Sequence, residues 1–371
     1  MKEISLYIHI PFCRCKCNYC DFFSVTHEPD PAGRYVEALS KKLRIYSGSY
    51  DFSTVYCGGG TPSVLSVDQL YLLLSEIALK AGAEFTVEVN PESVSEEKLS
   101  VMRAAGVNRL SIGIQSLYDS VLDFLGRPHT VQQAYDAVYT AFKSGFDNLS
   151  VDLIYAVPGK TLAMWKEELK TACSLPVKHI SLYSLTYERG TPLFKDLQQS
   201  RFVPVPDTED AAMYQYAQEF LADNGFIQYE ISNFAREGFY SRHNDNYWKN
   251  GEYAGIGAGA VEYLDRERRR NIEDVEAYIT AVNKGGDTFV EKERLAPEAF
   301  ALETAVLNLR SKSGIVCDSF ISFTGYDIRE LRGREIDKLI KEGLVEHTGN
   351  NRFCLTCNGF RFYDYIAREL I

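Results

Sequence analysis

The sequence contains no long apolar run, and no stretch approaches the roughly 20 consecutive apolar residues that a membrane-spanning helix needs. We expect no secretory leader either, because Met1, Lys2 and Glu3 lead directly into a strand-like segment. A net positive charge is missing as well, since 51 acidic residues against 40 basic ones give a charge of -11. Phosphate binding depends on clustered Lys and Arg. We therefore expect no transmembrane segment and no nucleic-acid partner.

A disulfide framework is also absent from the pattern of cysteines. The nine cysteines are odd in number and unevenly spaced, which favours a reducing compartment and a cytoplasmic location. The chain of 371 residues is 45 % hydrophobic, which is enough to bury a large core. Its length predicts one large unit and a smaller one, which we place at residues 1–265 and 266–371.

The strongest chemical signal is the spacing CxxxCxxC formed by Cys13, Cys17 and Cys20. Three soft thiolates on one loop can each bind one iron of a cubic [4Fe-4S] cluster and leave the fourth iron open. Cys15 offers an alternative, because four thiolates could close a structural zinc site. Zinc knuckles usually consist of two separated pairs, and the only other close pair of cysteines is more than 330 residues away. We therefore expect the cluster, with Cys15 as an incidental thiol.

Strand-like and helical patterns alternate over the first two thirds of the chain. Strands are expected at residues 4–10, 53–57, 85–89, 109–114, 149–154 and 180–185, and helices at 34–46, 68–80, 95–105, 131–143, 162–173 and 207–224. Six strand-then-helix units require parallel pairing with right-handed crossovers, as in a barrel, an incomplete barrel or a doubly wound sheet. Polar motifs follow successive strands, as expected if the strand ends surround one site.

These polar motifs match the groups of a nucleoside bearing an amino acid. A glycine turn at 58–63 exposes backbone amides to a carboxylate or an ammonium group. Glu88, Gln115 and Asp152 lie at or near the ends of the next three strands, and their oxygens suit a ribose diol. The guanidinium of Arg127 suits a carboxylate. Each residue alone could pair with a helix N-terminus, but their succession favours a common cavity.

Two motifs follow the repeating units. The segment HNDNYW at 243–248 contains His243 and Tyr247, which are candidate haem contacts, although polar residues beside a glycine loop are more often structural. The segment GIGAGA at 255–260 formally fits GxGxxA, but we expect neither a strand before it nor a helix after it, so nicotinamide or flavin binding is not expected. The basic run at 266–270, interrupted by Glu267, is typical of a solvated turn, with carboxylate binding as the alternative.

The C-terminal segment has a different pattern. Helices are expected at 275–283, 298–309 and 329–342, a hairpin at 344–347 and 352–355 around Gly349, Asn350 and Asn351, and a last helix at 360–370. This order resembles a winged helix, a fold that need not bind DNA. Cys354 and Cys357 are expected to be strand thiols rather than half of a metal site.

With these segments assembled, the chain resembles the coproporphyrinogen dehydrogenase family of radical S-adenosylmethionine (SAM) proteins, and within it the HemW-type haem chaperones. The similar segments follow the family's order, at residues 7–22, 58–63, 88–91, 109–116, 125–129, 152–159, 181–192, 229–234 and 243–259. The resemblance implies an α/β partial (βα)6 TIM-like barrel with a smaller C-terminal domain, and a [4Fe-4S] cluster on Cys13, Cys17 and Cys20. It also implies SAM contacts from Tyr7, Tyr19, Gly59, Gly60, Thr61, Glu88, Gln115, Arg127 and Asp152, with Thr186 and Val261 as weaker candidates near a second SAM or substrate space.

Two departures separate this chain from the true dehydrogenase, which resembles CxxxCxxCxC and carries a long N-terminal extension. Here Phe22 stands at the last position of that motif, and only 12 residues precede Cys13. Both departures favour the chaperone branch, whose members bind haem as cargo and deliver it to respiratory haemoproteins. The alternative is an oxygen-independent coproporphyrinogen III oxidase, which converts propionates to vinyl groups by means of a deoxyadenosyl radical.

Overall fold

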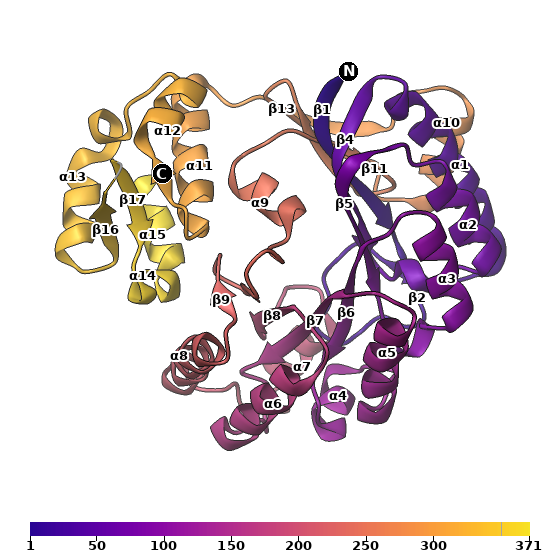
Figure 1. Cartoon of the computed structure of the whole chain (residues 1–371), viewed down its shortest axis with the longest axis horizontal. Coiled ribbons are helices and arrows are strands. Elements are labelled where there is room, and N and C mark those ends of the chain that lie inside the picture. The colour runs from indigo at the N-terminus through magenta and orange to yellow at the C-terminus, as the bar shows by residue number, and fades with distance from the viewer. Residues whose placement is uncertain (350) are drawn as a thin grey trace.

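A twisted 12-stranded sheet is the main feature of the computed structural model, which describes residues 1–349 and 351–371. Seven neighbouring strands of the described chain run parallel (Figure 1), in the order β11 (Tyr253–Ile256), β1 (Lys2–Ile10), β4 (Tyr50–Gly59), β5 (Leu79–Val89), β6 (Arg109–Gln115), β7 (Asn148–Tyr155) and β8 (His179–Ser184). At the far edge β10 (Asn233–Ala235) and β9 (Ile227–Gln228) continue antiparallel. The predicted α/β partial barrel is confirmed.

Helices cover the outside of this sheet and connect its strands. They are α1 (Pro29–Ser47), α2 (Val67–Ser75), α3 (Glu96–Ala104), α4 (Asp119–Leu125), α5 (Val131–Lys143), α6 (Leu162–Ser174), α7 (Pro192–Gln198) and α8 (Asp207–Asp223). Helices α4 and α7 were not predicted, because seven residues give too few periodic positions. The helix expected at 68–80 was too long. It ends at Ser75, and β5 already begins at Leu79.

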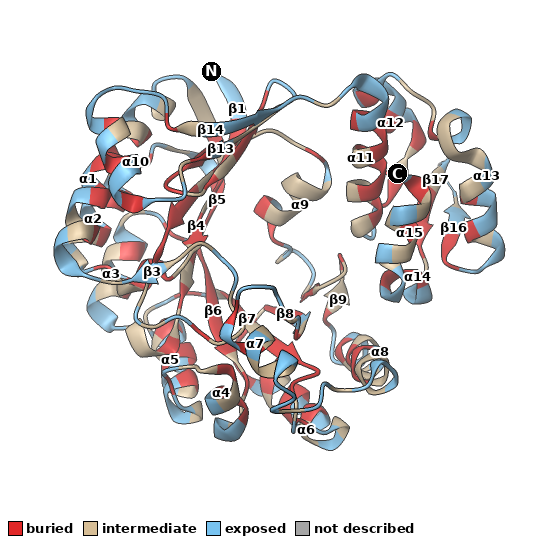
Figure 2. Ribbon diagram, turned by 180° about the vertical axis from the view of Figure 1, so that it is seen from behind, coloured by how far each residue is buried: buried red, intermediate tan, exposed pale blue. Residues whose placement is uncertain are grey.

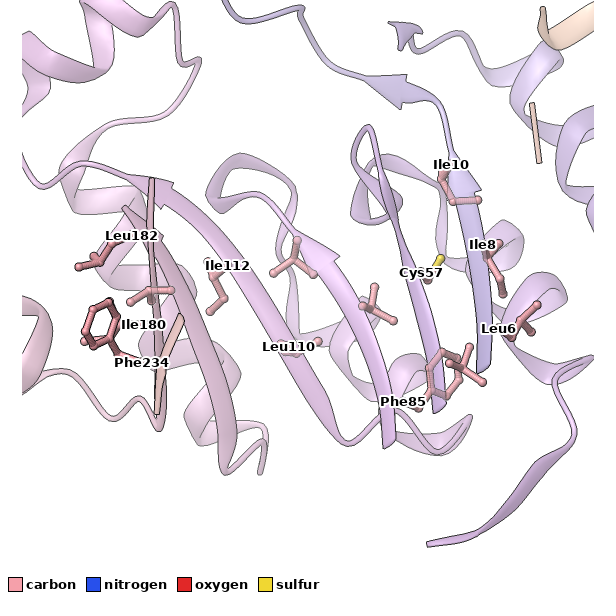
Figure 3. Packing of buried hydrophobic residues seen from close by; sticks show 14 of the residues in the cluster. Leu6, Ile8, Ile10, Cys57, Phe85, Leu110, Ile112, Ile180, Leu182 and Phe234 are labelled. Carbon is pink, nitrogen blue, oxygen red and sulfur yellow. The ribbon is translucent and has the colours of Figure 1, made fainter. Parts of the chain in front are cut away.

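The strands alternate between an apolar face and a polar one. On β1, Leu6, Ile8 and Ile10 are fully buried in the hydrophobic core that the covering helices complete (Figure 3), while Tyr7 and His9 alternate with them. Since successive side chains of a strand point to opposite faces, the second set faces the interior of the barrel. Figure 2 shows buried residues along the central strands. The interior of the barrel is therefore polar, as a binding site requires.

The sheet continues beyond residue 265. Strands β12 (Val261–Leu264), β13 (Glu267–Asn271) and β14 (Phe289–Glu293) add antiparallel to β11, and α10 (Val275–Asn283) packs on α1. Residues 267–293, assigned above to the second unit, thus extend the first sheet, because antiparallel hairpins lengthen a sheet without any βα rhythm. We propose that the division between the units lies after β14.

Two smaller expectations about this region were wrong. A strand, β11, does lead into the GxGxxA motif, since residues 253–256 form it, although no strand was expected there. As expected, no helix follows, because the next element is the antiparallel strand β12. The basic run is mostly strand β13 rather than a turn. Arg268 pairs with Glu303 and Arg269 with Glu262, so these guanidinium groups bind carboxylates of the same chain.

The C-terminal unit has the order of a winged helix. It comprises α11 (Pro297–Arg310), β15 (Ile315–Val316), α12 (Cys317–Thr324), α13 (Ile328–Lys341), β16 (Val345–Thr348), β17 (Arg352–Leu355), α14 (Cys357–Arg361) and α15 (Tyr363–Leu370). Strands β15, β17 and β16 form an antiparallel sheet. The expected last helix is broken at Phe362 into α14 and α15. Cys354 is buried on β17, whereas Cys357 is exposed at the start of α14, and Asn350 of the expected turn lies outside the described residues.

Helix α9 (Arg242–Trp248) lies between the sheet and the C-terminal unit in both views (Figures 1 and 2). Asn250 Nδ2 donates to Thr304 Oγ1 at 2.9 Å, and Asn308 Nδ2 donates to the Trp248 carbonyl at 2.9 Å. These bonds fix α11 against the end of α9. No helix of the described residues is long and apolar enough to cross a membrane.

Candidate iron-sulfur and S-adenosylmethionine site

The cysteine loop follows β1 and is held in place by distant segments. Strand β2 (Phe12–Cys13) pairs with β3 (Val25–Thr26), and the chain between them carries the other cysteines. Asn18 anchors this loop, because its backbone N–H donates to the Leu125 carbonyl at 3.0 Å and its carbonyl accepts from Leu193 N–H at 2.9 Å. Gly126 caps α4 with φ 70°, and a Cβ there would lie 2.8 Å from the Asn18 side chain, so only glycine fits.

The three cysteines of the CxxxCxxC motif line one cavity at the C-terminal ends of the strands. Cys13 Sγ accepts a hydrogen bond from Thr61 Oγ1 at 3.6 Å, and Cys17 Sγ accepts one from Arg127 Nη1 at 3.3 Å. Burial raises the pKa of the Cys20 thiol to about 11. Hydrogen-bond donors to sulfur stabilise a thiolate-bound cluster. The donor set therefore fits an iron-sulfur cluster.

A structural zinc site was the alternative for this loop. Within the described residues, no three His, Cys, Asp or Glu side chains gather closely enough to hold one metal ion. A cubic cluster does not need such a gathering, because each thiolate binds a different iron. Cys15 also lines the cavity, and its Sγ lies 4.0 Å from the Gly126 carbonyl.

Arg127 connects the cluster loop to the strand ends. Its Nη2 donates to Asn90 Oδ1 at 2.8 Å and to the Gly113 carbonyl at 2.9 Å. Asn90 Nδ2 in turn donates to Thr61 Oγ1 at 2.8 Å. Asn90 was not predicted as a site residue, although a polar residue directly after β5 indicates the edge of the sheet where the site lies. The Nε atom of Arg127 is buried and has no partner among the described residues.

Glu88 lies beside the glycine turn. Its carboxylate accepts hydrogen bonds from Tyr56 Oη at 2.7 Å and from Gly59 N–H at 3.1 Å. Burial raises the pKa of Glu88 to about 7. Gly59 has φ 107°, and a Cβ there would lie 2.3 Å from the His9 ring, so the close approach of this turn requires glycine. A carboxylate next to free space and backbone amides can bind an ammonium group.

Asp152 and Gln115 complete the polar floor of the cavity. Burial raises the pKa of Asp152, whose two carboxylate oxygens accept from Ser111 Oγ at 3.3 Å each. Gln115 ends β6 with φ 60°, an uncommon conformation for a non-glycine residue. Acceptors of this kind suit the two hydroxyls of a ribose.

Most of the predicted site residues meet in this cavity, which has a volume of about 1090 Å³. Those that line it are Cys13, Cys17, Tyr19, Cys20, Gly59, Gly60, Thr61, Glu88, Gln115, Arg127, Asp152 and Thr186. The opposite wall, which the sequence analysis did not predict, comes from α8 and from the C-terminal unit, and includes Arg310, Arg361 and Phe362. Cavities for drug-sized ligands measure roughly 300–1,000 Å³, so this one has room for more than SAM.

The other predicted residues lie outside the cavity lining. Tyr7 Oη is 2.9 Å from His9 Nδ1, and His9 Nε2 is 2.9 Å from the Phe23 carbonyl, so Tyr7 reaches the cluster loop only through His9. Val261 lies on β12, paired with Arg270.

His243 and Tyr247 also lie apart from the cavity lining, on α9. His243 is fully buried, with Nδ1 2.8 Å from Thr54 Oγ1 and Nε2 2.9 Å from Tyr247 Oη. Burial lowers the pKa of His243 to about 3, so the ring is neutral.

Comparison with known proteins agrees with this geometry. The sequence profile of the radical SAM superfamily matches residues 7–172, and that of the HemN C-terminal domain matches residues 295–362. The heme chaperone HemW of Lactococcus lactis is 39 % identical over all of this chain and 98 % of its own length, and that of Bacillus subtilis is 36 % identical over 96 % of each. The chain belongs to the HemW family of radical SAM proteins.

The HemW family has a mitochondrial relative too. The radical S-adenosyl methionine domain-containing protein 1 of Danio rerio is 36 % identical over 84 % of this chain and 74 % of its own length. Among solved structures, the Escherichia coli coproporphyrinogen III oxidase HemN matches with a TM-score of 0.86 over all of this chain and 90 % of that one, at 20 % identity. At that identity the match supports the fold alone. Membership in the superfamily implies SAM and a [4Fe-4S] cluster, which fit the residues described above.

Proposed function

We propose that this protein binds haem as cargo and passes it to a haemoprotein, with SAM on a [4Fe-4S] cluster held by Cys13, Cys17 and Cys20. The observation that carries this proposal is the identity to the HemW chaperones over the full length of both chains. The cavity supports it, because its volume of about 1090 Å³ leaves space beside the SAM residues. We also propose a cytoplasmic location, since nine free cysteines suit a reducing compartment.

The chemistry of the site residues assigns each of them to one part of SAM. When bound, a reduced [4Fe-4S] cluster supplies an electron to SAM at its open iron. Glu88 is placed to bind the ammonium group of SAM, and the guanidinium of Arg127, which lines the cavity, to bind its carboxylate. Asp152 and Gln115 are placed to accept from the ribose hydroxyls.

The alternative function is the coproporphyrinogen III oxidase reaction. The resemblance to the coproporphyrinogen dehydrogenase family leaves it open, but Phe22 stands where the dehydrogenase motif has a fourth cysteine. Anaerobic titration of the reconstituted protein with haemin tests the proposal. We expect saturable binding at one haem per chain and no protoporphyrinogen from coproporphyrinogen and SAM. Formation of protoporphyrinogen, or a spectrum that haemin does not change, would contradict the chaperone function.

A further inference from the structure

The lining of the cavity consists of two sets of residues with different chemistry. We call the lower level the set formed by the cysteines and the strand-end carboxylates. We call the upper level the set formed by Phe22 and by residues of β8, α8 and the C-terminal unit, whose Arg310, Arg361 and Phe362 are not among the residues assigned above to the cluster or SAM. A second ligand can therefore lie above the first.

Aromatic side chains are exposed around this upper level. Phe22 is 65 % exposed, Phe362 46 % and Tyr183 44 %, and all three line the cavity. Phe22 comes from the cluster loop, Tyr183 from β8 and Phe362 from the junction of α14 and α15. Large apolar side chains are rarely left in water around a single hollow unless a ligand covers them, and flat rings favour a flat ligand.

Two arginines of the C-terminal unit lie at the same level. Arg361 packs beside the Phe362 ring, at 5.9 Å from its centroid, and makes no ion pair among the described residues. Arg310 stacks on Trp248 at 4.4 Å and lies 3.5 Å from the Glu230 carboxylate. Guanidinium groups bind carboxylates in a bidentate manner, so this wall suits an acidic ligand edge.

The part of the upper level that comes from α8 is acidic. Asp207 and Asp210 line it from α8, and Asp210 accepts a hydrogen bond from Ser184 Oγ at 2.6 Å. Carboxylates repel like charges, so the acidic edge of a ligand must face away from α8 and toward the C-terminal arginines. The charges therefore favour a flat, dianionic molecule whose carboxylates lie on the arginines rather than on α8.

We infer that the upper level binds the tetrapyrrole, with the macrocycle between the aromatic side chains Phe22, Tyr183 and Phe362 and its propionates on Arg361 and Arg310. This inference rests on the proposed function and adds the place and orientation of the cargo. Since Trp248 ends α9 and stacks on Arg310, the helix that carries His243 supports this wall from behind.

The test uses the full chain with its cluster reconstituted, and haemin and haemin dimethyl ester as probes. The variants are Phe362→Ala and Arg361→Glu. The matched controls are Phe323→Ala and Arg334→Glu, because both control side chains are exposed on the C-terminal unit outside this cavity. Binding is followed by absorption, and the SAM affinity of each variant shows whether the barrel is intact.

We expect each variant to weaken haemin binding by about tenfold and each control to leave it unchanged. The dimethyl ester should bind the unaltered protein more weakly than haemin does, and Arg361→Glu should not weaken it further. Haemin affinities equal to the control values in both variants would overturn the location and leave the proposed function standing. Failure of the unaltered protein to bind haemin, despite an intact cluster, would overturn both.

Discussion

Lys160 and Glu168 form an ion pair in which neither side chain has exposed surface. The Glu168 carboxylate also accepts hydrogen bonds from Ser116 Oγ at 2.5 Å and from Leu117 N–H at 2.6 Å. Both donors directly follow Gln115, whose φ of 60° aims the end of β6 at the cavity. The pair therefore holds a strained turn of the SAM site from behind, without contacting the ligand space.

The first prediction concerns Glu168→Gln. The amide can still accept from the turn but leaves the Lys160 ammonium buried without a countercharge. Breaking a buried pair in this way costs about 3–5 kcal/mol of folding free energy, and we expect SAM to bind more weakly as well. Urea unfolding and anaerobic SAM titration measure the two effects. Glu167→Gln, at an exposed position of the same helix, is the control. Equal stability and SAM affinity of the two variants would show that the ion pair does not hold the turn after Gln115.

The second prediction separates the cluster ligands from their neighbour. Cys17→Ala should abolish the visible iron-sulfur absorption and lower the amount of bound iron, because only two cysteines would then remain to bind the cluster. Cys15→Ala should retain both, since Cys15 only approaches the Gly126 carbonyl. Circular dichroism checks that each variant is folded. Equal loss of iron from the two variants would mean that the ligands are wrongly assigned.

The third prediction follows from the pKa of Glu88, which burial raises to about 7. Only the ionised carboxylate attracts the SAM ammonium, so affinity should increase as the pH rises from 5.5 to 7.5, by up to about tenfold per unit below the pKa. Glu88→Gln should bind weakly with little slope. Anaerobic calorimetry measures how the SAM affinity of each protein depends on pH. The titration of SAM itself affects both proteins equally, so it cancels in the difference between them. An unchanged slope in the variant would exclude Glu88 as the ammonium partner.

The fourth prediction concerns His243, whose ring stacks on Tyr56 at 5.1 Å and whose two nitrogens are hydrogen-bonded. His243→Ala should lower the free energy of unfolding by about 2–4 kcal/mol, because it leaves a cavity and unsatisfied hydroxyls. His347→Ala, at an exposed site, is the control. The haem contact remains a prediction, and it requires the ring to leave Tyr247. An unchanged stability of the variant would show that this buried arrangement does not hold α9 in place.

The sequence predicted the barrel side of the site because its signals are local. Glu88 and Gln115 lie at the ends of parallel strands and Asp152 lies within the next strand, and parallel strands bring their ends to one edge whatever their separation in the sequence. Asn90 escaped notice because an Asn-Pro pair after a strand is typical of an ordinary turn. Its role depends on Thr61 and Arg127, which approach it only in the folded chain.

The cavity wall from the C-terminal unit and the extension of the sheet were not predicted, because they depend on long-range packing. Nothing near Arg310 or Phe362 in the sequence indicates that both face the cluster loop, some 290 to 340 residues earlier. That placement comes from the docking of α11 on α9, through bonds such as Asn308 to the Trp248 carbonyl. The extension of the sheet by β12 to β14 was hidden for a related reason, since the basic residues of β13 conceal the apolar alternation of a strand.

The most direct test of this account is Mössbauer spectroscopy of the anaerobically reconstituted, iron-57-labelled protein before and after addition of SAM. We predict a [4Fe-4S] cluster in which the signal of one iron changes when SAM binds, because three cysteines leave that iron open to a further ligand. A centre that does not respond to SAM, or a preparation that holds zinc in place of iron, would contradict the account.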